Sequence, residues 1–293
     1  MTYSAFQQLV AAHFQKTLGD KVQISIQSIP KNNHICLDGL IVTEPDCNIS
    51  PTLYLNYYYR EFCNGASIDS ILARLLDTYY ASRADSNIDV RFFTDYDQVS
   101  PRILYKLINT AQNQELLQDI PHISFLDLSI VFYCLLTPFS SGNATILIHN
   151  HHLSFWNATT EMLYQCAVAN TPRLLPPKLL DMNHFLSSHL PKQDTPPFVS
   201  PMYILTNSQK LYGAAGMLNQ HILSNFALTR QSDFYILPSS IHEVLLLPSD
   251  KAFDPAELNK MVQEVNDSQL SREEILSDHV YYYSLKNHAI EVM

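Results

Sequence analysis

Hydrophobic positions follow first a helical and then a strand period near the start of the chain. Residues 4–18 place apolar side chains on one helical stripe, made of Phe6, Leu9, Val10, Phe14 and Leu18. Apolar and polar residues then alternate from Val22 to Ile26, which is the period of a half-buried strand. A turn at 31–33 predicts a second strand that continues to about residue 42.

Capping residues predict two helices after this hairpin. Ser50 and Pro51 fit the N-cap and the first helical position, where a missing N–H costs nothing. Gly65 fits the end of that helix. Ser67 fits the N-cap of the next helix, which carries apolar residues on one face as far as Tyr79.

The middle of the chain repeats this order of elements. Its pattern predicts, in chain order, a strand at 88–93, a helix opened by Ser100 and Pro101 that runs to 111, a long strand at 121–136, a turn at 140–143, a strand at 145–153, a helix capped by Thr159 and a helix at 179–190.

The C-terminal third gives the clearest signals. It predicts a strand at 202–205, a helix at 211–228, a hairpin of 234–237 with 244–247, a helix capped by Asp254, and strands at 280–283 and 289–292. In the hairpin, Tyr235 and Leu237 should face away from Phe234 and Ile236. The whole pattern predicts an α+β protein with recurring helix–β-hairpin–helix units and mainly antiparallel sheets.

A polar, proline-rich segment at 191–200 is the best linker candidate. It predicts two lobes. The first is an N-terminal α+β lobe at 1–190, with room for two helix–hairpin–helix units, and the second is a C-terminal α+β lobe at 201–293.

Composition and charge narrow the functional classes. The net charge is −10, and no stripe of Lys or Arg offers a phosphate-binding face, so nucleic acid is a disfavoured partner. No apolar run approaches the roughly 20 residues of a membrane helix, and the N-terminus lacks the pattern of a signal peptide. Five widely spaced cysteines fit reduced thiols, so we expect a cytoplasmic protein without a membrane partner.

Histidines gather at 149–152, after His122 and Asp127 in the preceding predicted strand. Imidazoles are common metal ligands, so this region is the candidate site of an uncharacterised hydrolase or metalloenzyme that uses His149, His151, His122 or Asp127. On a strand, however, only His149 and His151 share a face, and two ligands make no metal cage. We therefore expect no metal and no cofactor.

Asp127 stands among apolar neighbours on a strand that should be mostly buried. A buried carboxylate needs hydrogen-bond partners or a shifted pKa. We expect a structural role, in which Asp127 accepts hydrogen bonds from nearby groups. Ser239, Ser240, His242 and Glu243 have the residue types of a hydrolytic triad, but one tight turn cannot align them, so we expect them to serve the turn.

Aromatic residues are the candidates for a binding surface. Tyrosine combines a large contact area with a polar tip, which suits protein interfaces. The candidates are Tyr57, Tyr59, Trp156, Tyr281 and Tyr283. With no nucleotide-binding or hydrolase motif in the chain, these residues favour a non-enzymatic protein-interaction module over an enzyme.

Several segments together carry a family resemblance, among them ISPTLYLNYYY (49–59), IPHISFLDLSIVFYCLL (120–136), DFYILPSSIHEVLLLP (233–248) and LSDHVYYY (276–283). The chain resembles a domain-of-unknown-function family of Gram-positive bacterial proteins. The resemblance implies a bacterial cytosolic setting and brings no catalytic residues with it. We therefore expect a bacterial cytosolic protein with a protein partner.

Overall fold

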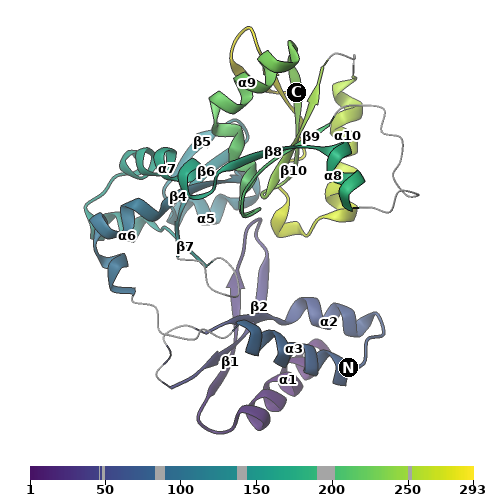
Figure 1. The fold of residues 1–293 in the computed structure, drawn as a ribbon. Coiled ribbons are helices and arrows are strands. Elements are labelled where there is room, and N and C mark those ends of the chain that lie inside the picture. The colour runs from purple at the N-terminus through teal and green to yellow at the C-terminus, as the bar shows by residue number, and fades with distance from the viewer. Residues whose placement is uncertain (46, 48–49, 83–89, 137–143, 190–201, 250–252) are drawn as a thin grey trace. The chain divides into compact units, whose positions relative to one another are not determined.

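The computed structural model describes residues 1–45, 47, 50–82, 90–136, 144–189, 202–249 and 253–293. They form two compact units (Figure 1). The first unit comprises residues 1–93 and 136–144, and the second comprises 94–135 and 145–293. The sheets pair antiparallel throughout the described part, which confirms the predicted α+β class.

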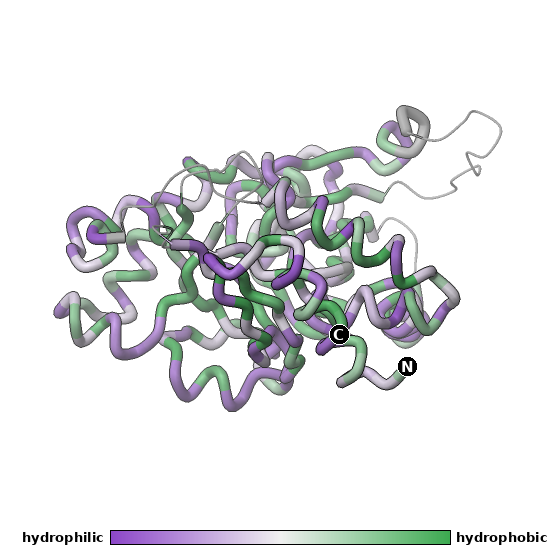
Figure 2. Tube along the Cα trace, turned by 90° about the horizontal axis from the view of Figure 1, so that it is seen from below, coloured by the Kyte–Doolittle hydropathy of each residue, from purple (hydrophilic) through white to green (hydrophobic). Residues whose placement is uncertain are grey.

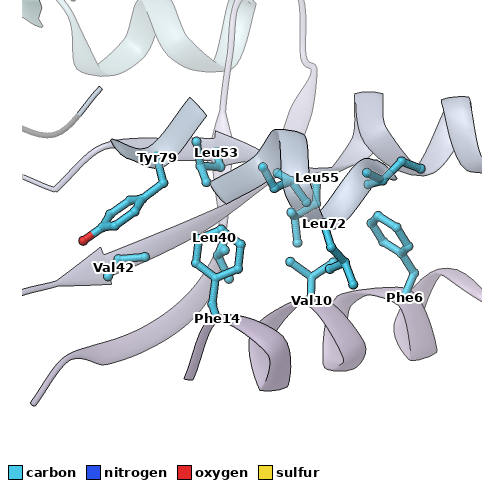
Figure 3. Packing of buried hydrophobic residues seen from close by; sticks show 11 residues of the cluster. Phe6, Val10, Phe14, Leu40, Val42, Leu53, Leu55, Leu72 and Tyr79 are labelled. Atoms are coloured by element: carbon cyan, nitrogen blue, oxygen red, sulfur yellow. The ribbon is translucent and has the colours of Figure 1, made fainter. Parts of the chain in front are cut away.

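The first unit packs helices on a three-stranded sheet of order β1-β2-β3. Its elements are α1 (Tyr3–Leu18), β1 (Gln23–Pro30), β2 (Cys36–Thr43), β3 (Thr52–Tyr54), α2 (Leu55–Cys63) and α3 (Ile68–Ser82). Figure 3 shows Phe6, Val10 and Phe14 of α1 facing the sheet and the other helices. Leu40 and Val42 of β2 lie in this core, two positions apart, because alternate side chains of a strand share a face.

The helix predicted to begin at Ser50 begins later, at Leu55. Residues 52–54 instead form β3, which pairs Leu53 with the buried Leu40 of β2. The strand pairing and burial of Leu53 therefore outweigh the helix-capping preference of Ser50 and Pro51. The second capping signal is confirmed, because the Ser67 hydroxyl accepts a hydrogen bond from the Ser70 N–H at 3.2 Å.

The second unit contains two sheets. The four-stranded sheet has the order β4-β6-β5, and β7 also pairs with β6. The elements around it are α4 (Tyr96–Val99), β4 (Ile103–Asn109), α5 (Gln114–Asp119), β5 (His122–Phe125), β6 (Leu128–Leu135), β7 (Thr145–Leu147), α6 (Asn150–Trp156) and α7 (Thr160–Leu174). The Thr159 cap of α7 is confirmed by the 3.3 Å bond from the Met162 N–H to its hydroxyl.

Three predictions for this sheet are wrong. Residues 103–109 form strand β4 rather than a helix, because a strand buried on both faces loses the alternation that marks a strand. The long strand at 121–136 is two strands, which a turn at Leu126 and Asp127 separates. The partner strand stops at Leu147, so the histidines of 149–152 lie at the start of helix α6.

The other sheet of this unit has six strands, in the order β13-β12-β10-β11-β9-β8. Its strands are β8 (Pro177–Asp181), β9 (Tyr203–Asn207), β10 (Phe234–Ser240), β11 (Glu243–Pro248), β12 (Tyr281–Ser284) and β13 (Ala289–Val292). Its helices are α8 (Met182–His189), α9 (Gln220–Arg230) and α10 (Pro255–Gln269). Apolar and hydrophilic stretches alternate along the chain, as the colours of the tube in Figure 2 show.

The predicted hairpin of β10 and β11 is confirmed, and it pairs Tyr235 with Leu247. Its predicted alternation is also confirmed. Tyr235 packs with Val262 of α10, whereas Phe234 meets Phe226 of α9 edge-on, with ring centroids 4.9 Å apart. The two helices therefore cover opposite faces of this sheet.

Three further segments differ from the prediction. A 3₁₀-helix occupies Val90–Thr94, where a strand was predicted. Strand β8 precedes α8 in the predicted helix at 179–190, and a 3₁₀-helix at Gly213–Leu218 precedes α9. The predicted turn at 140–143 lies outside the described residues.

The described units divide at Phe93 and Thr94, whereas the sequence predicted a boundary at 191–200. That proline-rich segment lies outside the described residues. Strand β8, which precedes it, pairs with β9, which follows it. Residues 177–181 thus belong to the same sheet as the C-terminal strands, and a lobe ending at 190 would cut this sheet.

The core of the first unit predicts a contrast between two leucines on its helices. Leu75 of α3 is fully buried, whereas Leu9 of α1 is 36% exposed. Leu75→Ala should lower the free energy of unfolding by about 2–5 kcal/mol, because it removes buried methyl groups and opens a cavity. The same change at Leu9 should cost less than about 1 kcal/mol. Urea unfolding followed by circular dichroism measures both, and equal losses would contradict this core.

Candidate functional site

Asp127 lies at the centre of a polar cluster in the second unit. Its Oδ2 accepts hydrogen bonds from the Ser277 hydroxyl at 2.7 Å and from the His279 Nδ1 at 3.1 Å. Its Oδ1 accepts a bond from the Tyr281 hydroxyl at 2.8 Å. We call these four residues the Asp127 cluster. It joins the four-stranded sheet to the segment that leads into β12 of the six-stranded sheet.

Local structure explains this arrangement. Leu126 adopts a left-handed backbone conformation with φ of 56°, which turns the chain tightly between β5 and β6. The Thr110 N–H donates to the Asp127 carbonyl at 3.1 Å and fixes the turn. Ser277 precedes a bend at 278–279, His279 lies in it, and Tyr281 is the first residue of β12, so the chain folds locally before it enters the strand and brings all three donors to Asp127.

Asp127 is less buried than the sequence predicted. It lies in a turn and not inside a strand, and its side chain is 25% exposed. Burial, followed by the negative charge of Asp127, raises the pKa of the Tyr281 phenol. Tyr281 therefore stays protonated and remains a hydrogen-bond donor to the carboxylate.

The cluster contains Ser, His and Asp, but its bonds differ from those of a hydrolytic triad. In a triad the serine donates to histidine, and the aspartate orients the histidine from the other side. Here the Ser277 hydroxyl donates to Asp127 and accepts the His279 backbone N–H at 3.0 Å. The hydroxyl and the imidazole thus bond the same carboxylate oxygen, which favours a structural role.

Two amide side chains extend this network. Asn109 of β4 donates to the Leu276 carbonyl at 3.1 Å. Asn266 of α10 donates to the Ser277 carbonyl at 3.0 Å and to Asp278 Oδ1 at 2.8 Å. The segment before β12 is therefore held from a strand, a turn and a helix.

The histidines of 149–152 cap a helix. The Nδ1 of His152 accepts the His149 backbone N–H at 2.9 Å, and the Nδ1 of His149 lies 2.6 Å from Asp119 Oδ2. The prediction that His149 and His151 share one face of a strand is wrong, because both belong to the start of α6. His122 Nδ1 lies 3.1 Å from the Ile120 carbonyl. In the part of the chain that the structure describes, no three His, Cys, Asp or Glu side chains are placed to hold a metal ion.

Most aromatic candidates lie in the core. Tyr281 and Tyr283 are fully buried, and Trp156 is 7% exposed and stacks on His152. These three offer no accessible binding face, which corrects the prediction made for them. Tyr59 is half-buried and packs on Phe6, and its hydroxyl donates to the Met1 carbonyl. Tyr57 is likewise half-buried on α2.

The sequence analysis missed a small pocket in the second unit, with an inner volume of about 20 Å³. Tyr105, Thr206, Asn207 and Tyr212 line part of it. The Tyr212 ring stacks on His242, with centroids 5.5 Å apart, and also lies 4.4 Å from the Lys106 Nζ. These groups come from distant parts of the chain, so local spacing gave no signal for them.

His242 holds the loop beside this pocket. Its Nδ1 accepts the Tyr212 N–H at 3.2 Å, and burial is the main cause that lowers its pKa. Its carbonyl would lie 2.4 Å from a Cβ at position 213, so only glycine fits there. Glycine at this position therefore permits the close packing of the two backbone segments.

Strand β1 is the other candidate site, because it is the outermost strand of the first unit's sheet. It has eight residues, QISIQSIP, and none of them is charged. Its pairing with β2 runs without a bulge from Gln23 to Pro30. Ile24 and Ile26 pack only partly against the core. Natural edge strands are usually short, charged, bulged or interrupted by proline, which prevents other strands from pairing with them.

The other outermost strands of the described part are charged or short. Lys106 lies in the middle of β4, Lys178 in the short β8 and Glu291 in the short β13, while β3 and β7 have three residues each and β5 has four. In β1 the single protective feature is Pro30, at its last position. The β1 edge is therefore the one most open to strand addition in the part of the chain described.

These features define an α+β protein of antiparallel sheets, with a hydrogen-bonded polar cluster in one unit and an uncharged strand edge in the other. A family model described as a family of unknown function (DUF5688) matches residues 3–285, and the chain belongs to this family. No curated protein and no solved structure matches it. Within the described residues, every helix is too short or too polar to cross a membrane.

The Asp127 cluster predicts the effect of removing one charge. Asp127→Asn should lower the free energy of unfolding by about 1–3 kcal/mol, because the new amide group would face hydrogen-bond donors. Asp267→Asn is the control, since Asp267 is an exposed residue of α10. Thermal or urea unfolding of both variants measures the difference. An Asp127→Asn protein as stable as the control would show that the cluster contributes little.

The His152 cap predicts a dependence of stability on pH. Burial, followed by the nearby His151 and His149, lowers the pKa of His152 from 6.5 to about 4. Because the folded protein favours the neutral ring, this contribution is present above pH 6.5 and is lost as the pH falls toward 4. His152→Gln keeps an acceptor at the usual capping-box position and cannot titrate, so it should flatten this loss.

The matched control for this prediction is His221→Gln, which replaces an exposed histidine. Its unfolding midpoint should follow that of the wild type between pH 7 and about 4. If His152→Gln loses stability as steeply as the wild type does, the buried neutral imidazole is not the cause.

Proposed function

We propose that the chain is a bacterial cytosolic, non-enzymatic protein-interaction module that takes an extended segment of a partner chain as an added strand beside β1. The observation that carries this proposal is the uncharged, unbulged eight-residue edge of β1. Strand addition uses main-chain hydrogen bonds for affinity and alternate side chains for specificity.

The structure indicates which backbone groups would receive the added strand. The Lys31 N–H donates to the Ile35 carbonyl, and this pair continues the register in which Pro30 lies opposite Cys36. In an antiparallel ladder the residues that bond to one neighbour alternate with residues that point away from it. The odd-numbered residues of β1 therefore bond to β2, and the N–H groups of Ile24, Ile26 and Ser28 point to the open edge.

The polar candidates support the same proposal. Asp127 accepts three side-chain bonds, and His149 caps α6 and faces Asp119. Groups held in this way stabilise the fold and are poorly placed for proton transfer or nucleophilic attack. The cysteines of the described residues are all free thiols, which is typical of a reducing compartment.

A pair of substitutions at one position tests the proposal. Ser28→Pro removes an outward N–H without breaking a bond to β2, whereas Ser28→Ala keeps that N–H. The wild type and both variants would be held sparsely on a surface, so that copies do not meet. They would then be exposed to a displayed library of 12-residue peptides that includes random sequences and the chain's own β1 segment.

Peptides selected on the wild type should bind Ser28→Ala equally well. They should bind Ser28→Pro about tenfold more weakly, which corresponds to one lost hydrogen bond and a steric block. Urea unfolding would confirm that both variants are folded. Equal binding to all three proteins, or no selectable peptide, would reject strand addition at β1.

A further inference from the structure

The charge of β1 bears on which partner it takes. The chain has a net charge of −10, so two copies repel each other unless their contact surface is locally neutral. A strand edge that selects a charged peptide would carry complementary charges, but residues 23–30 carry none. A neutral edge on an acidic chain fits a second copy of the same chain.

The side-chain pattern of β1 is also complementary to itself. In an antiparallel pair with Ser25 on a twofold axis, Ile24 lies opposite Ile26 of the second copy, and Gln23 lies opposite Gln27. Residues directly opposite share a face of the sheet, so the isoleucines of both copies form one row on the helix side. That row would cover the parts of Ile24 and Ile26 that their own core leaves uncovered.

The backbone agrees with this register. Ile24 and Ile26 both point their N–H and carbonyl groups outward, so each cross-strand pair that they form exchanges two hydrogen bonds. A register centred on Gln27 would instead place Ile24 opposite Pro30, which has no N–H to donate. With Ser25 on the axis, Pro30 lies beyond the paired segment.

We infer that two copies of this chain associate through β1, antiparallel and with Ser25 on the twofold axis, to form one continuous six-stranded sheet from two three-stranded sheets. This inference rests on the proposed function, for which it names the partner. The contact uses the same edge on both copies, so it closes after two chains and does not grow into a fibre.

Two substitutions at Ser25 test this arrangement. Ser25→Asp places two carboxylates directly opposite each other across the axis, where like charges destabilise a strand pair. Ser25→Asn has nearly the same shape without the charge. Sedimentation of the full chain over a range of micromolar concentrations should give a dimer of twice 33.5 kDa for the wild type and for Ser25→Asn. Ser25→Asp should remain a monomer near neutral pH and dimerise again when its carboxylates are protonated.

Disulfide formation gives an independent measurement. Residues 25 and 27 direct their backbone groups toward β2, so each would form a non-hydrogen-bonded pair with the residue opposite it in the second copy. The Cα atoms of such a pair lie about 4.5 Å apart, which is within the range of a disulfide. In a background with Cys36, Cys47 and Cys63 replaced by serine, Ser25→Cys should form a covalent dimer on mild oxidation. Gln27→Cys, the matched control, should form much less of it.

A wild type that stays monomeric would overturn the second copy as partner. A Ser25→Asp dimer as stable as Ser25→Asn, or preferential crosslinking of Gln27→Cys, would overturn the axis at Ser25. None of these results would reject strand addition, because the peptide selection with Ser28→Pro uses sparsely held chains and does not depend on dimerisation. Failure of that selection together with a monomeric wild type would reject both proposals.

Discussion

The carboxylate of Asp127 joins parts of the second unit that are far apart in the sequence. Its two oxygens accept bonds from three side chains of 277–281, at the entry to β12. Hydrogen bonds to a charged acceptor are stronger than those between neutral groups, and an unpaired partner there would be costly. The turn at Leu126 is needed because it directs this one carboxylate toward all three donors.

The polar side chains of this chain that resemble catalytic groups are already engaged in hydrogen bonds that stabilise the fold. Polar residues that suggest catalysis in the sequence are held by neighbours whose geometry suits stability. Asp127 orders the approach to β12, and the histidines at 149–152 order the start of α6. Main-chain groups at the edge of β1 have no strand partner among the described residues, and the proposed strand addition would use these groups.

The outermost strands of the sheets differ in how well their residues prevent other strands from pairing with them. β4 and β1 are both outermost strands, but Lys106 interrupts the apolar pattern of β4, whereas β1 contains only Gln, Ser, Ile and Pro. A neutral edge on an acidic chain risks aggregation unless a specific partner covers it. Twofold pairing would cover it and leave no further edge on that side.

The sequence by itself determined the helices and strands in which hydrophobic residues recur at a regular spacing, because that spacing identifies the one face that is buried. The stripe of α1, the alternation of β1 and the hairpin of β10 with β11 follow from local patterns, and the caps at Ser67 and Thr159 follow from local chemistry. It also singled out Asp127, because a carboxylate among apolar residues needs partners.

Only the tertiary structure decided the rest. β4 has no alternation because both of its faces are buried, so its pattern suited a helix equally well. The partners of Asp127 lie 150 or more positions away, and local spacing cannot specify such contacts. The sequence likewise predicted β1 as a strand but not as an edge, because an edge is defined by which strands pair, and pairing depends on how the whole sheet assembles.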